Sequence, residues 1–267
     1  MSLHRFFLDN QVLAAETNEV FPLRLAPGDA KHARVLRLTP GEHVAVVDAA
    51  SDYFECEIVR IDDAIPIVRI ARREDAKVSR PQVILVQGLA KGDKMDSVVR
   101  HATELGVAAF VPLACERAIV KLDAKKAASR RERWQTIAKS AAMQSGQPFV
   151  PDVAPVATLD QAIELICEAT AVLVCWEEAP GSAAIDEALW EGMKRCACSQ
   201  VADARVAVVV GPEGGLADRE VSRIVEGVKR GFTVSLGPSI LRTETAGVVA
   251  PALVLYELGC LGARGIR

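Results

Sequence analysis

The first seventy residues alternate between short hydrophobic runs and turn-forming residues. Three runs rich in β-branched side chains are separated by small and acidic residues, and they cover residues 43–48, 53–61 and 66–71. Such runs predict short strands. Between residues 27 and 38 the apolar spacing predicts a short helix instead, which Asp29 can cap and Pro40-Gly41 stops. Short strands with one small helix indicate a compact β-barrel.

The period of the pattern changes after a charged segment, residues 73–80, which has the composition of a linker. Buried-strand patterns then occur at residues 83–87, 108–113, 171–176, 206–210 and 232–236. Helical patterns lie between them at residues 93–105, 125–144, 159–169, 185–196 and 218–227. This alternation predicts a mostly parallel sheet with helices on both faces. We expect an α/β protein with domains at residues 1–72 and 81–267.

The last hydrophobic segment, residues 243–258, predicts an apolar helix rich in small side chains. Pro251 lies inside it and should kink it or remove one backbone hydrogen bond. A helix this apolar has to be buried. It lies either under the sheet or against a partner subunit.

Composition adds few constraints on function. Half of the 267 residues are hydrophobic and a quarter are charged, as in ordinary globular proteins. No run approaches the roughly 18–20 apolar residues of a membrane helix, and the N-terminal apolar run is too short for a signal peptide. A cytoplasmic protein is the simplest interpretation. The seven cysteines are scattered and read as thiols, and the lone C-x-C at Cys196 and Cys198 does not indicate zinc. We expect no catalytic metal.

Charge is unevenly distributed around a net value of −3. Residues 69–80 carry a net charge of +3 and residues 121–133 a net charge of +4, whereas residues 158–204 carry −7. A basic face on an acidic protein fits contact with phosphates. From charge alone, a solvated helix face is the favoured interpretation.

Two glycine-rich segments follow predicted strands and precede predicted helices. The first is Gly211-Pro212-Glu213-Gly214-Gly215-Leu216, which has neither the Gly-Lys-Ser/Thr of a phosphate loop nor the spacing of the dinucleotide fingerprint. In the second, Gly237-Pro238 breaks the strand and Thr243 has the character of a helix N-cap. Either segment alone is ordinary turn chemistry. Together, at the strand ends where α/β folds bind ligands, they favour a cofactor site as much as simple turns.

Several motifs, in order and with their spacing intact, resemble the RsmE family of ribosomal RNA methyltransferases within the SPOUT superfamily. The paired cofactor motifs of that family are similar to Gly211–Gly215 and to Leu236-Gly237-Pro238-Ser239-Ile240-Leu241-Arg242-Thr243-Glu244-Thr245-Ala246. Lys91-Gly92-Asp93-Lys94-Met95, Ala102–Val107 and Gln144-Ser145-Gly146 match further motifs. His32, Val35, Leu36, Arg37 and Gly41, with Arg5-Phe6-Phe7, resemble its N-terminal PUA-like RNA-binding domain. The resemblance covers nearly the whole chain.

The resemblance implies a SPOUT α/β domain with a deep trefoil knot, preceded by a small PUA-like β-barrel. It also implies a homodimer that uses S-adenosyl-L-methionine to methylate N3 of a uridine in 16S ribosomal RNA of the small ribosomal subunit. The implied cofactor-binding residues come from three strand ends and the final helix: Cys175, Trp176, Glu177, Gly211, Pro212, Glu213, Gly214, Gly215, Leu236, Gly237, Pro238, Ile240, Leu241, Thr245 and Ala246.

Methylation of uridine N3 requires loss of the N3 proton and in-line alignment with the methyl donor, in a site that orients both reactants. The base must be unpaired or extruded from its stack. We assign Arg242 to an RNA phosphate or a uracil carbonyl. Glu244 or Glu104 could accept the proton or organise Arg242, and a structural ion pair is the competing interpretation. The candidate RNA contacts are basic residues in both domains: Arg5, His32, Arg34, Arg37, Lys91 and Lys94.

The chain departs from the family pattern at three positions that concern RNA contacts. Met143 stands where an acidic residue is usual, and Gln147 and Ser239 stand where arginine is common. Two alternatives remain: a knotted methyltransferase acting on ribose 2′-hydroxyls, and a non-catalytic RNA-binding assembly factor. The first is disfavoured because Glu104-Leu105-Gly106 does not resemble the Asn- and Arg-containing motif of those enzymes.

Overall fold

A computed structural model describes residues 3–63, 65–74, 80–176 and 182–262 of the chain. Within it the chain forms two compact units. The first comprises residues 1–78 and 142–150, and the second comprises residues 79–141 and 151–267. Within the described residues, no helix is long and apolar enough to cross a membrane.

The first unit is built on a five-stranded sheet with the order β1-β3-β4-β5-β2. The strands are β1 (His4–Phe7), β2 (Phe21–Pro22), β3 (His43–Val47), β4 (Tyr53–Asp62) and β5 (Ile65–Glu74). β3, β4 and β5 pair in antiparallel fashion, and β1 pairs with β3 in parallel. In β4 alternate residues Phe54, Cys56 and Ile58 are buried, as expected when one face of a sheet covers a core.

The helix of the first unit, α1 (Pro27–Leu36), lies within the range 27–38 that the sequence pattern predicted. Pro27 occupies its first turn, where a missing backbone N–H costs nothing. The expectation that Asp29 caps this helix is wrong, because Asp29 lies inside the first turn and is buried. The helix ends where Arg37 adopts a left-handed backbone conformation, with φ of 51°, ahead of the Pro40-Gly41 stop.

Residues 142–150 belong to the first unit although sequence analysis placed them in the second domain. Ala142 and Met143 are buried in the hydrophobic cluster of the first unit. The guanidinium of Arg5 donates a hydrogen bond to the carbonyl oxygen of Gly146 and lies 5.1 Å from the ring centre of Tyr53. The segment therefore contributes packing and backbone acceptors to this unit.

The second unit contains a six-stranded, wholly parallel sheet with the order β11-β9-β10-β6-β7-β8. Its strands are β6 (Gln82–Gly88), β7 (Ala109–Leu113), β8 (Asp152–Val153), β9 (Ala171–Cys175), β10 (Arg205–Val210) and β11 (Gly231–Val234). Its helices are α2 (Lys94–Leu105), α3 (Ala124–Ser145), α4 (Leu159–Ile166), α5 (Ile185–Arg195), α6 (Asp218–Gly227) and α7 (Thr243–Glu257). The predicted alternation of strands and helices is confirmed.

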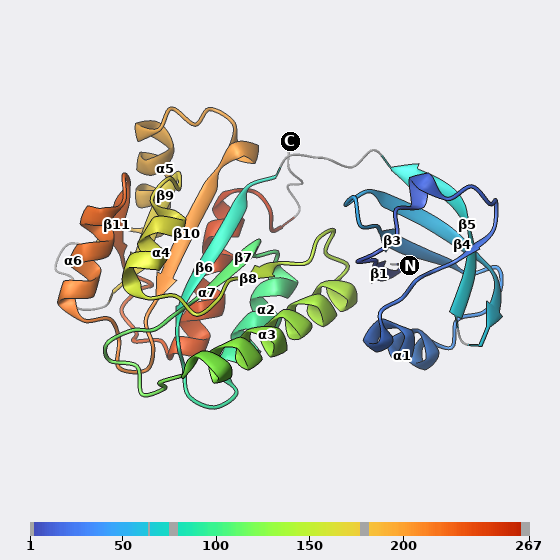
Figure 1. Ribbon diagram of the computed structural model, residues 1–267. Coiled ribbons are helices and arrows are strands. Elements are labelled where there is room, and N and C mark those ends of the chain that lie inside the picture. The colour runs from blue at the N-terminus through green and yellow to red at the C-terminus, as the bar shows by residue number, and fades with distance from the viewer. Residues whose placement is uncertain (1–2, 64, 75–79, 177–181, 263–267) are drawn as a thin grey trace. The chain divides into compact units, whose positions relative to one another are not determined.

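Hydrophobic clusters on both faces of this sheet explain why its strands are continuous apolar runs. Val83 and Leu85 of β6 pack with α2, α5 and α7 on one face. Ile84 and Val86 of the same strand pack with α4 and α6 on the other face. Figure 1 shows helices on both sides of the sheet.

The final helix, α7, lies in the hydrophobic cluster shared with the sheet, α2 and α5, so its expected burial is confirmed. Gly247 allows close packing here, because a Cβ at that position would collide with the side-chain oxygen of Gln87 on β6. The helix contains Pro251 and leaves Leu253 and Tyr256 exposed, at 41% and 62%. One side of α7 is therefore without cover within the described chain.

Candidate functional site

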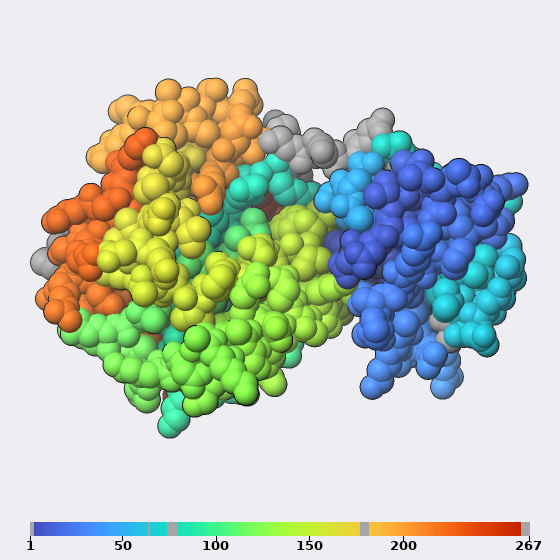
Figure 2. Space-filling view, viewed as in Figure 1, coloured from blue at the N-terminus to red at the C-terminus, as the bar shows by residue number. Residues whose placement is uncertain are grey.

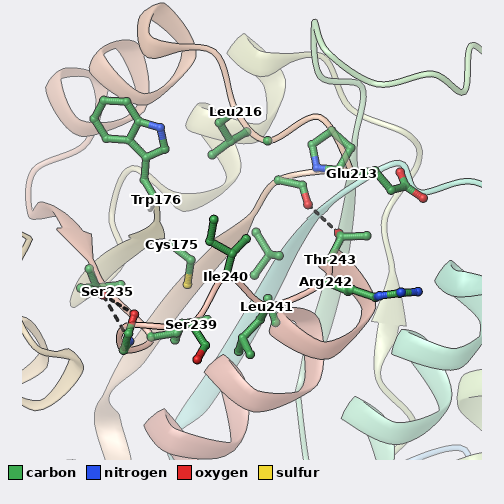
Figure 3. Close-up of a pocket in the computed structure, with 18 of the residues that line it drawn as sticks. Cys175, Trp176, Glu213, Leu216, Ser235, Ser239, Ile240, Leu241, Arg242 and Thr243 are labelled. Carbon is green, nitrogen blue, oxygen red and sulfur yellow. Dashed lines mark hydrogen bonds between the residues drawn. The ribbon is translucent and has the colours of Figure 1, made fainter. Parts of the chain in front are cut away.

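A cavity of about 390 Å³ lies at the carboxyl ends of β9, β10 and β11, which are neighbours in the sheet. In Figure 3, Cys175 and Trp176 lie on one side of it and Glu213 and Arg242 on the other. Most of the residues expected to bind the cofactor line it. The exceptions are Gly214, Pro238 and Thr245, which do not, and Glu177, which lies outside the described residues.

The first wall is the loop Gly211–Leu216, which follows β10 and turns back on itself. The N–H of Gly215 donates to the carbonyl of Pro212 at 2.9 Å, and Gly215 has a left-handed φ of 70°. At Gly211 an added Cβ would lie 2.9 Å from backbone atoms of Gly215 and Leu216. At Gly214 a Cβ would meet the carbonyl of Arg117 at 2.8 Å. The loop therefore depends on its glycines to fold tightly beside the cavity.

The second wall is the loop from Ser235 to Arg242, between β11 and α7. Gly237 adopts a left-handed φ of 108°, and its N–H donates to the hydroxyl of Ser235 at 3.2 Å. Leu241 packs against the neighbouring hydrophobic cluster, while Ile240 lines the cavity and is 81% exposed. The loop thus offers apolar side chains and a tight glycine turn to whatever binds there.

A buried hydrogen-bond chain joins the two walls. Thr243 donates from its hydroxyl to the carbonyl of Gly211 at 2.6 Å and accepts from the side-chain amide of Gln87 at 2.9 Å (Figure 3). Gln87 and Thr243 are 1% and 6% exposed. Thr243 was expected to be the N-cap of α7, which is wrong: Arg242 is the N-cap, and Thr243 is the first helical residue. Its side chain bonds to the neighbouring loop instead of its own helix.

Charged side chains meet at the end of the cavity where α2 begins. The ammonium of Lys94 lies 3.0 Å from a carboxylate oxygen of Glu213 and 3.2 Å from one of Glu244. The backbone N–H of Lys91 also donates to Glu213, at 3.0 Å. The side chains of Lys94, Glu213 and Glu244 are 27%, 24% and 25% exposed. We call Lys94, Glu213 and Glu244 the ionic bridge.

The pKa values of the bridge follow from these contacts. Hydrogen bonds to Glu213 and then to Glu244 raise the pKa of Lys94 above its ordinary value. Partial burial pushes the pKa of Glu213 upward, but hydrogen bonds from its own N–H, from Lys94 and from Lys91 lower it overall. The pKa of Glu244 is also lowered, by a hydrogen bond from the backbone N–H of Glu244 and by Lys94. Both carboxylates are therefore ionised at neutral pH, and the lysine is protonated.

The three candidate catalytic residues are placed differently. Arg242 lines the cavity, and within the described residues its guanidinium has no hydrogen-bond or ion-pair partner. Glu244 does not line the cavity, but it forms an ion pair with Lys94, which does. Glu104 does not line the cavity and is exposed ten residues after Lys94 in α2, a rise of about 15 Å along the helix.

Some of the candidate RNA contacts are exposed, and others are engaged by neighbouring residues. His32 and Arg34 on α1 and the adjoining Arg37 are exposed. The charged end of Arg5 is engaged by Gly146 and Tyr53 within the first unit. Lys91 is exposed beside the cavity, and Lys94 belongs to the ionic bridge.

The departures from the family pattern fall in different environments. Met143 is buried in the core of the first unit, a place that suits an apolar side chain, and Ser239 lines the cavity. Gln147 lies in the segment 142–150 that returns to the first unit.

Comparison with known proteins identifies the family. An RNA methyltransferase domain model matches residues 78–255. The chain is 33% identical over 260 residues to ribosomal RNA small subunit methyltransferase E of Bacillus subtilis, covering 96% of this chain and 97% of the relative. The chain belongs to this RsmE family of RNA methyltransferases. The enzyme of the same name from Aquifex aeolicus is 32% identical, covering 87% of this chain and 93% of its own.

The fold is shared with a solved member of the family. The crystal structure of ribosomal RNA small subunit methyltransferase E from Neisseria gonorrhoeae, bound to S-adenosyl methionine, matches with a TM-score of 0.74 at 26% identity. The match covers 95% of this chain and 97% of that one. The RsmE resemblance drawn from the sequence motifs is thus confirmed.

The cavity fits the cofactor of this family. A volume of about 390 Å³ lies in the range of roughly 300–1,000 Å³ that small-molecule sites occupy. Its walls combine apolar side chains from Leu216, Ile240 and Leu241 with backbone groups of two glycine turns. Within the described residues, no cluster of three or more potential metal ligands occurs.

Two features of the site were missed from the sequence. Gln87 is a polar residue near the end of an apolar strand. Because buried polar groups are normally hydrogen-bonded, its amide indicated a buried partner, which is Thr243. The pairing of Lys94 with Glu213 and Glu244 joins residues more than a hundred positions apart. No local pattern carries that information.

Proposed function

We propose that this chain transfers the methyl group of S-adenosyl-L-methionine to N3 of a specific uridine in the 16S RNA of the small ribosomal subunit. The observation that carries the proposal is the cavity between two glycine turns that Thr243 ties together, in a chain of the RsmE family. Relatives named as small subunit methyltransferases support the substrate. Since that RNA is made and assembled in the cytoplasm, we place the reaction there.

The residues that would hold the cofactor are those of the two loops and the end of β9. When bound, S-adenosylmethionine would supply a methyl group from a positively charged sulfur, and that sulfur would keep the electron pair of the broken sulfur–carbon bond. The N3–methyl bond forms as the sulfur–methyl bond breaks, and the N3 proton passes to solvent or to a nearby carboxylate. Ile240, Leu241 and Trp176 line the cavity with apolar surface, and orientation of the two reactants would supply most of the rate.

Arg242 is the cavity cation available to the RNA. Its guanidinium has five donors and no partner within the described residues, so it can bind a phosphate or a uracil carbonyl oxygen. A donor at the carbonyl would stabilise negative charge on the uracil as the N3 proton leaves. Glu244, held ionised near Lys94 and Arg242, organises these cations and is the favoured proton acceptor of the two candidates Glu244 and Glu104. Glu104 is the less favoured acceptor because of its distance from the cavity.

The finer architecture follows the family. We propose that the second unit is threaded as a trefoil knot, supported by the way the chain leaves β11 at the sheet edge and returns to the middle strands, where Thr243 bonds to Gln87 and Gly211. We propose that the first unit is the PUA-like domain and binds RNA through the exposed basic residues of α1 and its end: His32, Arg34 and Arg37. We also propose a homodimer, supported by the uncovered apolar side chains of α7.

Mass spectrometry of ribosomal RNA tests the function directly. Small-subunit RNA from cells lacking this protein should lose one 3-methyluridine, and restoring the gene should return it. Purified protein with S-adenosylmethionine should also methylate that unmodified RNA. RNA that keeps every methylated uridine in the deletion strain would contradict the proposal.

The same experiment separates the two alternatives. A ribose 2′-hydroxyl methyltransferase would leave a missing 2′-O-methyl nucleoside, and a non-catalytic assembly factor would leave the methylation pattern intact. Isothermal titration adds a second criterion, because a pure RNA-binding factor has no need of the cofactor.

A further inference from the structure

A second hollow adjoins the cofactor cavity on the surface of the second unit. It has a volume of about 620 Å³ and is open to solvent between the N-terminal ends of α2 and α3. Figure 2 shows α3, in green, on the molecular surface. The side of α3 contributes the basic residues Lys126, Arg130 and Arg133, and the α2 side contributes Gly92, Asp93 and Asp96. We call this hollow the α2–α3 groove.

The acidic residues of the groove do not cancel its positive charge. Asp96 is 5% exposed and accepts hydrogen bonds from Arg133 at 2.8 Å and from the indole N–H of Trp134 at 3.1 Å. Lys126 lies 3.3 Å from Asp123, in an exposed pair that water screens. Arg130 is exposed and has no ion-pair or hydrogen-bond partner within the described part of the chain.

The charge around the groove is positive overall. Asp93 is the lining carboxylate that remains exposed. Residues 121–133, which form this side of α3 and the loop before it, carry six basic and two acidic side chains. The groove therefore offers an unsatisfied guanidinium in a field that attracts anions.

The groove and the cofactor cavity share a wall. Gly92 and Asp93 line the groove, and Lys94, the next residue, lines the cavity. The left-handed φ of 72° at Gly92 turns the chain sharply between them. The N–H of Lys91 bonds to Glu213 at 3.0 Å, which fixes this wall to the cofactor loop. A polymer lying in the groove would pass within one or two monomers of the proposed reaction.

We propose that the α2–α3 groove binds the sugar-phosphate backbone of the substrate RNA next to the methylated uridine, with Arg130 and Lys126 as the phosphate contacts. The inference rests on the proposed function. An RNA strand is the occupant because it is polyanionic, matches an open groove that a small anion would not fill, and has to reach the cavity beyond the shared wall.

The test uses the full-length protein and unmodified small-subunit ribosomal RNA made by transcription. RNA affinity is measured by filter binding over a series of salt concentrations for the wild type and for the double variant Lys126→Ala with Arg130→Ala. Affinity for S-adenosylmethionine is measured in parallel by isothermal titration. The control is Lys125→Ala, which removes one positive charge from the same helix at a position that does not line the groove.

We expect the double variant to bind the RNA at least fivefold more weakly at low salt. The slope of log affinity against log salt should fall by about 1.5, because each lost phosphate contact removes roughly 0.7–0.9. Cofactor affinity should stay within twofold of wild type, and Lys125→Ala should bind RNA within twofold of wild type. Replacing the pair by Lys126→Arg with Arg130→Lys should restore most of the RNA affinity.

An unchanged RNA affinity and salt slope in the double variant, in a protein whose wild type methylates the RNA, would overturn the groove assignment and leave the proposed function standing. A double variant that also loses cofactor affinity, and that the charge-preserving pair does not rescue, would overturn it as well. A wild type that binds the cofactor but methylates no small-subunit RNA would refute the proposed function itself.

Discussion

Thr243 shows at the scale of one residue how the site is held. Its hydroxyl uses both of its hydrogen-bonding abilities, toward Gly211 and toward Gln87, and its side chain is largely buried. A buried donor or acceptor that loses its partner costs about 1–3 kcal/mol. The hydroxyl thus links the position of one cofactor loop to the start of α7.

Thr243→Val should therefore lower the free energy of unfolding by about 1–3 kcal/mol. It should also weaken S-adenosylmethionine binding, because Gly211 is no longer held. Chemical denaturation and isothermal titration measure the two effects. Thr243→Ser keeps the hydroxyl and serves as the control. Wild-type cofactor affinity in Thr243→Val would show that the link does not support the site.

The ionic bridge makes a prediction about pH. Glu213 and Glu244 have pKa values below the ordinary 4.5, so their stabilising contribution is present above that pH and is lost as the pH falls through the lowered values. The pKa of Lys94 lies above the ordinary 10.5, so its contribution is present below that pH and is lost as the pH rises through the raised value. The bridge should be intact from about pH 5.5 to about pH 9.5.

The variant Lys94→Met removes the cation and leaves the two carboxylates near each other. The difference in unfolding free energy between wild type and Lys94→Met should be constant across the neutral range and should shrink below pH 4.5, where the carboxylates become protonated. Denaturant titrations at several pH values measure it. A difference that grows on acidification would contradict the assignment of the bridge.

Cys175 provides a chemical probe of the cavity. Its side chain lines the cavity and is partly exposed, as is that of Cys167, which does not line it. Bound S-adenosylmethionine should slow alkylation of Cys175 at least fivefold and leave the rate at Cys167 unchanged. Peptide mass spectrometry reads both sites in one sample. Cys56 and Cys115 are buried, and burial raises the pKa of each thiol to about 12, so both should remain unlabelled. Equal labelling of Cys175 with and without cofactor would place the ligand elsewhere.

At the same scale, sequence analysis found the residues that form a local motif. It missed those whose role depends on partners far away in the sequence. The glycines of the loop Gly211–Leu216 form a dense local motif. Gln87 reads as one more strand residue, and its role appears only when Thr243, 156 positions away, is brought beside it. The assignment of Lys94 to RNA likewise could not foresee its carboxylate neighbours.

At the scale of elements, the shape of the loop Gly211–Leu216, which lines the cavity, depends on glycine. A Cβ on Gly211 would lie 2.9 Å from two backbone atoms of its own loop, and backbone cannot move aside as a flexible side chain can. The loop would have to open to accept it.

Gly211→Ala should consequently weaken S-adenosylmethionine binding by at least tenfold, which isothermal titration would measure. Gly28→Ala is the control, since Gly28 lies in α1 with a negative φ and an added Cβ there meets nothing within 4 Å. Wild-type cofactor affinity in Gly211→Ala would mean that the tight turn is not needed for binding.

Regular elements were predictable where one period persisted over a whole segment. The longer parallel strands of the second unit are continuous apolar runs bounded by helices, so five of its six strands and their order along the chain followed from the pattern. The return of residues 142–150 to the first unit did not, because Ala142 and Met143 continue the helical pattern of α3 and their burial depends on which core they meet. The two-residue strands β2 and β8 were too short to produce a period.

At the scale of the whole molecule, the uncovered side of α7 bears on assembly. Leu253 is 41% exposed on this apolar helix, on the same side as the exposed Tyr256. If the proposed homodimer uses this surface, the protein should sediment at twice its chain mass of 28.6 kDa. Leu253→Lys should shift it toward the monomer. Leu165→Lys is the matched control, since Leu165 is 46% exposed on α4, across the sheet. A monomeric wild type, or a Leu253→Lys variant that remains dimeric, would contradict this interface.

The central claim is that two neighbouring glycine turns and the end of β9 together bind the methyl donor. The most direct measurement is a crystal structure of the protein soaked with S-adenosylmethionine or its demethylated product. The account predicts that ligand density fills the cavity bounded by Gly211–Leu216, Leu236–Leu241 and Trp176. Density at another site, with this cavity empty at saturating ligand, would contradict it.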